Sequence, residues 1–371
     1  MSLVDRTDVF VAGAGPAGLA AAIAARRKGF DVLMADPAQP PVDKACGEGL
    51  MPEGLAALAT LGIGIDPADG RIFRGIRFCE AARAVEAQFP AGYGIGIRRP
   101  RLHTLLTEHA ERLGVRICWG ARVSGLNDGA VSVNGRAIRS RWIVGADGHN
   151  SAIRTWAGLD SNHTSSRRFG FRRHFRVAPW TDHVEVHWGQ PCQVYVTPVA
   201  DDEICVALIT RDRRVRYDQI FSEFHDVARR LNGAPASSAL KGSVTVTRRF
   251  DAVARGQVAL IGEASGSVDA ITGEGMALAF QQAIALGEAL ASDDLTSYQT
   301  AHRRIGRLAV IMARLMLQMD RSTWLRHRVL RALAADPLLF PRMLAIHVGA
   351  LRPLKFGLAG TASLAWQLLT G

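Results

Sequence analysis

Three glycines and one aspartate near the N-terminus have the types and spacing of a dinucleotide-binding turn. Gly13, Gly15 and Gly18 follow an apolar run at G-x-G-x-x-G spacing, and Asp36 ends the next apolar run. The first glycine permits the tight turn, the second lets a pyrophosphate approach the backbone, and the third lets helix and strand pack closely. Phosphates would lie at the N-terminus of the following helix, where unpaired N–H groups favour negative charge. Asp36 is placed to accept hydrogen bonds from an adenosine ribose, so this stretch predicts a bound dinucleotide, either NAD or FAD.

Two further stretches place acids and glycines directly after apolar runs. Residues 145–154 read G-A-D-G-H-N-S-A-I-R, an A-D-G-x-x-S-x-x-R pattern. Residues 258–266 read V-A-L-I-G-E-A-S-G, and residues 269–276 continue as D-A-I-T-G-E-G-M into a predicted helix. The chain therefore carries three motifs in a fixed order.

Together these motifs resemble those of the p-hydroxybenzoate-hydroxylase-like group of FAD enzymes. An NAD dehydrogenase would need only the first motif, so the resemblance favours FAD. It implies an α/β fold in which a Rossmann-like FAD-binding domain carries an α+β second domain, the substrate domain, with an antiparallel sheet. It also implies that NAD(P)H supplies the electrons and binds only transiently, which agrees with the absence of a second glycine-rich strand–turn–helix unit from the sequence.

The resemblance assigns a part of the cofactor to each motif. The first motif matches the adenosine-pyrophosphate site, and the second matches a motif near the pyrophosphate that is also implicated in nicotinamide binding. Glu263 stands where the family usually has an Asp that hydrogen-bonds the ribityl chain, and Gly273–Gly275 open a helix whose positive end would stabilise the reduced flavin. Arg99 matches an R-x-x-L/F pattern whose Arg lies beside the cofactor, with Arg98 as the alternative. The predicted cofactor-binding residues are Gly13, Gly15, Pro16, Ala17, Gly18, Asp36, Cys46, Gly47, Arg99, Val123, Asp147, Gly148, Gly262, Glu263, Gly273, Glu274, Gly275 and Met276.

One stretch indicates a branch within this group. Residues 44–52 read K-A-C-G-E-G-L-M-P and resemble the K-x-C-G-[DE] signature of the geranylgeranyl reductases. The resemblance implies reduction of C=C bonds in a lipophilic small molecule. The alternatives are a monooxygenase that hydroxylates a phenolic, polyketide or lipid substrate through a flavin hydroperoxide, and a non-catalytic flavin redox module.

One cysteine could act chemically beside the flavin, and one set of three polar side chains could act away from it. Cys46 is the candidate catalytic residue, as a proton donor, and the alternative is a small side chain that only packs against the cofactor. His183, Glu185 and His187 alternate on a predicted strand and so share one face. Such a set can ligate a metal or act as acid and base. We predict no metal, and interpret the three as the polar face of a half-exposed strand.

The elements that must position these residues follow from hydrophobic periodicity. Residues 1–71, 92–167 and 251–295 are predicted to form the FAD-binding domain. Residues 72–91 and 168–250 alternate as strands do and are assigned to the substrate domain with its antiparallel sheet. Residues 296–371 are predicted to be a helical C-terminal segment.

Composition limits the remaining classes. The 371 residues are 48% hydrophobic and 21% charged, as in a folded globular protein. Five widely spaced cysteines without a C-x-x-C pair indicate reduced thiols and a cytoplasmic location. From residue 301 onward there are eleven Lys or Arg and two acids, without a nucleic-acid-binding motif, so we expect no nucleic-acid partner. A solvated helical face explains this charge, and the basic helices also permit peripheral contact with the inner face of a membrane.

Overall fold

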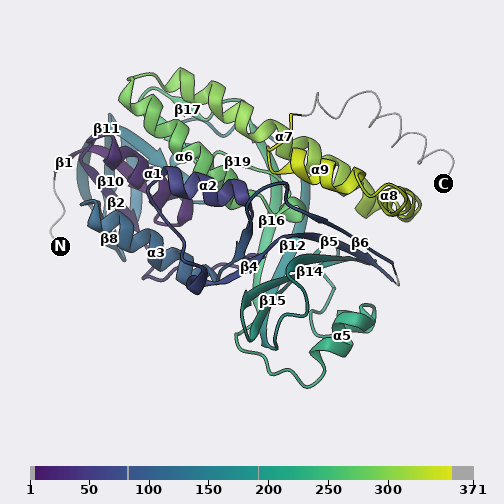
Figure 1. The fold of residues 1–371 in the computed structure, drawn as a ribbon. Helices are drawn as coiled ribbons and strands as arrows, with labels where there is room; N and C mark the ends of the chain where they lie inside the picture. The colour runs from purple at the N-terminus through teal and green to yellow at the C-terminus, as the bar shows by residue number, and fades with distance from the viewer. Residues whose placement is uncertain (1–4, 82, 191, 353–371) are drawn as a thin grey trace.

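The first apolar run forms the central strand of a parallel sheet. The structure, a computed structural model, describes residues 5–81, 83–190 and 192–352 (Figure 1). β1 (Arg6–Ala12) pairs in parallel with β2 (Val32–Asp36) on one side and with β11 (Arg136–Gly145) on the other. The sheet continues outward in the order β17 (Ala254–Arg255), β18 (Val258–Leu260), β11, β1, β2, β8 (Arg116–Trp119). A hairpin of β9 (Val123–Asn127) and β10 (Ala130–Val133) follows β8, and β10 pairs with β11.

Helices cover this sheet because their small residues permit close approach. α1 (Pro16–Arg27) is rich in alanine and packs against α6 (Gly275–Ala291). A Cβ on Gly287 of α6 would lie only 3.0 Å from Ala24 Cβ, so glycine eases the close approach of the two helices. The remaining helices around this sheet are α2 (Pro52–Thr60), α3 (Arg99–Arg112) and the short α4 (Ala152–Trp156).

A second large sheet carries the alternating sequences. It is antiparallel except where β13 runs parallel to β5. Its strands, in spatial order, are β19 (Gly266–Ser267), β16 (Lys241–Phe250), β12 (Asn162–Arg176), β15 (Glu203–Thr210), β14 (Cys192–Ala200), β13 (His183–Trp188), β5 (Gly75–Glu80) and β6 (Arg83–Gln88). A three-stranded sheet of β3 (Gly49–Leu50), β7 (Gly94–Gly96) and β4 (Arg71–Phe73) lies between the two large ones, and α5 (His225–Leu231) follows β15.

Three C-terminal helices span the two parts of the fold (Figure 1). α7 (Leu295–Arg321) runs beside α6 and continues over the second sheet, followed by α8 (Thr323–Ala335) and α9 (Leu339–His347). Phe340 of α9 packs on Phe78 of β5, with ring centroids 4.8 Å apart. The predicted helical segment extends to residue 371, and its part from residue 353 lies outside the described residues.

The architecture matches the predicted fold class, an α/β domain with an α+β second part and C-terminal helices. The division into residue ranges stays a prediction. No helix among the described residues combines the length and the apolar character that crossing a membrane requires.

Candidate functional site

The predicted cofactor residues converge on one cavity. It has a volume of about 1470 Å³ and lies between the C-terminal edge of the parallel sheet, the second sheet and the C-terminal helices. Of the predicted residues, those that line it are Gly13, Gly15, Pro16, Ala17, Asp36, Cys46, Gly47, Arg99, Val123, Asp147, Gly148, Gly262, Glu263, Gly273, Gly275 and Met276. Gly18 and Glu274 do not line it: Gly18 packs in the turn, and the Glu274 side chain is buried.

The glycines divide into two physical classes. A Cβ on Gly13 would lie 2.5 Å from Ala146 O, and one on Gly18 would lie 1.9 Å from Gly13 O, so both are needed for backbone packing. A Cβ on Gly15, Gly148 or Gly275 would meet no protein atom within 4 Å. The same holds for Gly47 and Gly273. The glycines without a neighbouring protein atom therefore leave open space along the cavity, as a bound dinucleotide requires.

The Asp36 carboxylate holds the glycine turn in place. Its Oδ2 accepts a hydrogen bond from Ala14 N at 2.6 Å, and its Oδ1 accepts one from Ala38 N at 2.8 Å. The side chain lines the cavity, so each oxygen keeps capacity for a ribose hydroxyl.

Asp147 lines the cavity and has one carboxylate oxygen without a partner among the described residues. Its Oδ2 accepts hydrogen bonds from Ala152 N and Ile153 N at the start of α4, 2.8 and 3.2 Å long. Its Oδ1 is buried without a hydrogen-bond partner among the described residues. A polar ligand group is therefore expected against Oδ1.

The last residue of the second motif joins it to the third. Arg154 is buried, and its Nη1 donates to Ala264 O at 3.1 Å. Its Nη2 donates to His149 O at 3.1 Å, and its Nε donates to Asp160 at 2.7 Å. The arginine thus connects the two turns that flank the cavity.

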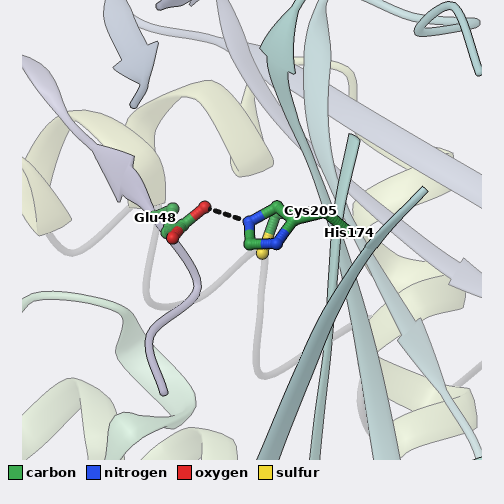
Figure 2. A group of neighbouring side chains, drawn as sticks. All are labelled: Glu48, His174 and Cys205. Carbon is green, nitrogen blue, oxygen red and sulfur yellow. Dashed lines mark hydrogen bonds and ion pairs between the residues drawn. The ribbon is translucent and has the colours of Figure 1, made fainter. Parts of the chain in front are cut away.

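The K-A-C-G-E stretch is fixed to both parts of the fold. Lys44 Nζ lies 2.7 Å from Glu263 Oε2 in the third motif. Glu48 has a φ of 60°, and its buried carboxylate lies 2.5 Å from His174 Nε2 on β12 (Figure 2). The Sγ of Cys205, from β15, donates to the carbonyl of Cys46 at 3.7 Å. Cys46 therefore lies in a loop held to the second sheet.

Glu48, Arg98 and Arg99 make different contacts around the start of α3. Glu48 Oε1 accepts a hydrogen bond from Arg99 N at 2.9 Å, which sets the start of α3. Arg98 forms an ion pair with Glu203 at 2.7 Å and does not line the cavity. Arg99 does, with its Nη1 3.4 Å from Met276 Sδ. Arg99 is therefore the arginine placed beside a bound ligand.

Beyond the glycine turns the cavity becomes apolar. Tyr195 lies there, and its hydroxyl donates to Ile271 O at 3.0 Å. The apolar lining comes from the second sheet and the C-terminal helices and includes Phe73, Ile76, Phe78, Val184, Val186, Met312, Met316, Val329, Leu333, Phe340, Met343 and Leu344.

A buried charge network supports the turn before α6. Arg168 of β12 is 0% exposed, and its Nη1 donates to Asp269 Oδ1 at 3.1 Å. Asp269 in turn caps the following turn by accepting from Ile271 N at 3.1 Å. Gln193 bridges Arg168 to Asp320 of α7 through hydrogen bonds to both. The predicted turn Thr272–Gly275 is therefore tied to the second sheet and to α7.

The predicted exposure of His183, Glu185 and His187 is wrong. They share a face of β13 as expected, but all three are buried. Glu185 Oε2 lies 2.9 Å from His187 Nε2 and accepts a hydrogen bond from Trp180 Nε1 at 3.0 Å. Trp180 lies beneath Arg230 of α5, so a tertiary contact covers the face that the strand pattern left open.

Comparison with known proteins identifies the family of this chain. The sequence model of the family described as "FAD binding domain" matches residues 6–294. The chain belongs to this FAD-binding family. Menaquinone reductase of Mycobacterium tuberculosis strain H37Rv is 30% identical over 325 residues, covering 80% of this chain and 79% of that protein. The predicted family, cofactor FAD and flavin-dependent oxidoreductase class are thereby confirmed.

Other sequence relatives differ in their named reactions, and solved structures share the fold of this chain. A digeranylgeranylglycerophospholipid reductase of Methanosarcina acetivorans is 32% identical over 43% of this chain and 42% of its own length. A rifampicin monooxygenase of Rhodococcus hoagii is 30% identical over 40% of this chain and 33% of its own length. The solved structure of a flavoprotein/dehydrogenase from Cytophaga hutchinsonii superposes with a TM-score of 0.84 at 18% identity, over 99% of this chain and 100% of that one.

The residues present fit FAD. The open glycines give room along the backbone, Asp36 can hold a ribose, and the orphaned Asp147 Oδ1 offers a buried acceptor. Glu263, predicted near the ribityl chain, lines the cavity and forms an ion pair with Lys44, which lines it too.

Proposed function

We propose that this chain uses electrons from NAD(P)H to reduce a lipophilic small molecule at its bound FAD, with C=C bonds as the preferred target. The observation that carries the proposal is the apolar half of the cavity, which is continuous with the glycine-lined half. The K-A-C-G-E loop and the relation to reductases of prenylated molecules support the same reading.

The residues of the chain have three tasks in this proposal. FAD supplies hydride transfer when bound. Asp36 and the open glycines bind its adenosine end, while the helix start at Gly275 directs backbone N–H groups toward its other end. The apolar wall formed by α7, α9 and the second sheet orients the substrate and excludes water. Cys46 lines the same cavity and is proposed to pack against the flavin as a small side chain, which is the alternative to its predicted role as proton donor.

Anaerobic turnover tests this function. The purified holoenzyme, NADPH or NADH, and menaquinone in detergent are combined without oxygen, and the product mass is recorded after exposure to air. We expect a gain of two hydrogens that persists in air, because reduction of a quinone ring alone would reverse. A colourless chain that cannot be reconstituted with FAD contradicts the proposal.

A monooxygenase is the second candidate, and the relation to a rifampicin monooxygenase favours it. This enzyme would consume oxygen and add one oxygen atom to a phenolic, polyketide or lipid substrate. Product formation that requires oxygen, with a mass gain of one oxygen atom, would select this candidate. A flavin module without activity would show no acceleration of NAD(P)H oxidation by any added substrate.

We also propose that the substrate reaches the cavity from an anionic membrane surface. Ile311 and Leu315 of α7 are 45% and 51% exposed and belong to the cavity lining, so they lie at its opening. Arg307 and Arg314 lie beside them on the exposed side of α7, and neither has an ion-pair partner among the residues the structure describes. Exposed apolar side chains among arginines match the chemistry of an interfacial helix.

Vesicle sedimentation measures this contact. The full chain should sediment with vesicles containing phosphatidylglycerol, less with pure phosphatidylcholine, and less again at high salt because the attraction is screened. Replacement of Ile311 and Leu315 by Ser should reduce binding about tenfold or more, from the apolar area lost. Leu240→Ser, at an apolar residue 37% exposed on a distant loop, is the control. Equal binding of the I311S/L315S variant and the wild type would contradict the contact.

A further inference from the structure

A pair of buried carboxyl groups lies behind the turn that opens α6. Glu274 is 6% exposed. Both carboxylate oxygens of Glu53, and Oε2 of Glu274, lack a hydrogen-bond partner among the described residues. The two side chains come from helices that pack on each other, α2 and α6. Carboxyl groups without partners in an apolar site avoid ionisation, because the charged form loses its hydration.

His347 connects this pair to the cavity. It belongs to α9 and lines the cavity, and its buried Nδ1 has no hydrogen-bond partner within the described part of the chain. Nδ1 lies 3.8 Å from Glu274 Oε2. Burial lowers the pKa of His347 to about 4, against a backbone hydrogen bond to Thr272 that raises it. The imidazole is therefore neutral at pH 7, with one nitrogen that carries a proton and one that can accept a hydrogen bond.

The surroundings keep a proton on the pair at neutral pH. Burial, and then the neighbouring Glu53, raise the pKa of Glu274 to about 8, while a hydrogen bond from Thr272 lowers it. Burial raises the pKa of Glu53 to about 7. The groups that face Glu274 are Glu53 from α2, His347 from α9 and Thr272 from the turn, and Arg99 of α3 contacts Met276 two residues further on.

We propose that Glu274, backed by Glu53, holds the proton that the substrate takes up at the flavin end of the cavity, and that His347 passes it on. The proposal rests on the proposed reductase function. When a C=C bond is reduced, one carbon gains a hydride from the reduced flavin and the other gains a proton. That proton leaves the other nitrogen of the neutral His347 ring as Nδ1 takes one from Glu274, so the ring stays neutral throughout, and the Glu274 carboxylate is reprotonated from water. A rotation of the Glu274 side chain closes the 3.8 Å gap.

The first test follows single steps of the holoenzyme. In Glu274→Gln, which keeps the shape and cannot ionise, anaerobic reduction of bound FAD by NADPH should proceed as in the wild type. Reoxidation by menaquinone should slow about 100-fold, the usual effect of losing a general acid. Glu288→Gln is the matched control, because Glu288 lies on the same helix with its side chain 66% exposed. Unchanged reoxidation in Glu274→Gln overturns the proposal, whereas a wild type that menaquinone does not reoxidise overturns the proposed reductase function instead.

The second test needs no cofactor or substrate. Glu274 ionises at pH 4.5 in an unfolded chain and at about 8 in the folded one, so between these values the folded state binds more protons. The free energy of unfolding of the wild type should therefore fall as pH rises from 5 to about 8. Glu274→Gln should remove most of this fall, and Glu53→Gln part of it. If the free energy of unfolding of Glu274→Gln falls with pH as in the wild type, Glu274 holds no proton and the proposal is overturned. This readout holds even if the variant no longer binds FAD.

Discussion

Gly15→Ala is expected to yield a folded protein that no longer retains FAD. The added methyl group meets no protein atom within 4 Å, and the backbone at Gly15, with φ −69° and ψ 174°, suits alanine. The methyl group instead occupies the space at the start of α1 where the pyrophosphate approaches the backbone. We expect FAD affinity to fall 100-fold or more, measured by titrating the apoprotein with FAD, while the urea midpoint of the apoprotein stays within error of the wild type.

Gly18→Ala, three residues away, should behave in the opposite way. Its Cβ would lie 1.9 Å from the carbonyl oxygen of Gly13, so the turn and α1 must move apart. Overpacking of this kind costs about 1–3 kcal/mol or more, and the apoprotein itself should lose stability. If Gly15→Ala instead destabilised the apoprotein as much as Gly18→Ala, the open glycines would not mark a cofactor site.

Arg168→Ala is expected to destabilise the protein by about 3–5 kcal/mol, because it leaves Asp269 as a buried charge without its cation and Asp320 with Arg211 alone. Arg168, Asp269 and Asp320 are each at most 3% exposed, so water cannot replace the lost charge. The loss should also loosen the turn that Asp269 caps, and FAD retention should fall with stability. Equilibrium unfolding in urea gives the first quantity, and flavin fluorescence after gel filtration gives the second.

The matched control is Arg173→Ala on the same strand. Arg173 forms an ion pair with Asp218 at 2.7 Å, but the Asp218 side chain is 71% exposed. Exposed pairs of this kind contribute less than about 1 kcal/mol. Equal losses for Arg168→Ala and Arg173→Ala would show that burial does not set the strength of the network.

Most of the residues that the sequence predicts for the cofactor line one cavity, because that part of the cavity depends on local rules. A tight turn, a close backbone approach and a helix N-terminus each demand particular residue types at fixed spacing, as at Gly13, Gly15 and Gly18. Glu274 shows the limit of this reasoning. The motif placed it among the cofactor-binding residues, yet its side chain turns into the interior, and only the packing of α2 and α9 reveals that.

The burial of the charged residues in the second sheet could not be predicted from the local sequence. Arg168, Arg172 and His174 alternate on β12 in a pattern typical of a solvated face, and all three are buried. Their partners, such as Glu48 and Asp269, lie far away in sequence. No periodicity signals such pairs, because burial on that face depends on elements that arrive from other parts of the chain.

α7 determines how the molecule can open. This helix has 27 residues, about 40 Å, and is anchored at both ends. Near its start the Tyr298 hydroxyl donates to Leu260 O at 2.7 Å, and near its end Asp320 joins the network of the second sheet. A helix anchored at both ends resists a hinge motion between the two large sheets. A long substrate tail that enters beside α7 must therefore be accommodated by displacement of α8 and α9, so we expect those two shorter helices to set the tolerance for tail length. Faster amide hydrogen exchange in α8 and α9 than at the ends of α7 would show this division, and equal exchange would refute it.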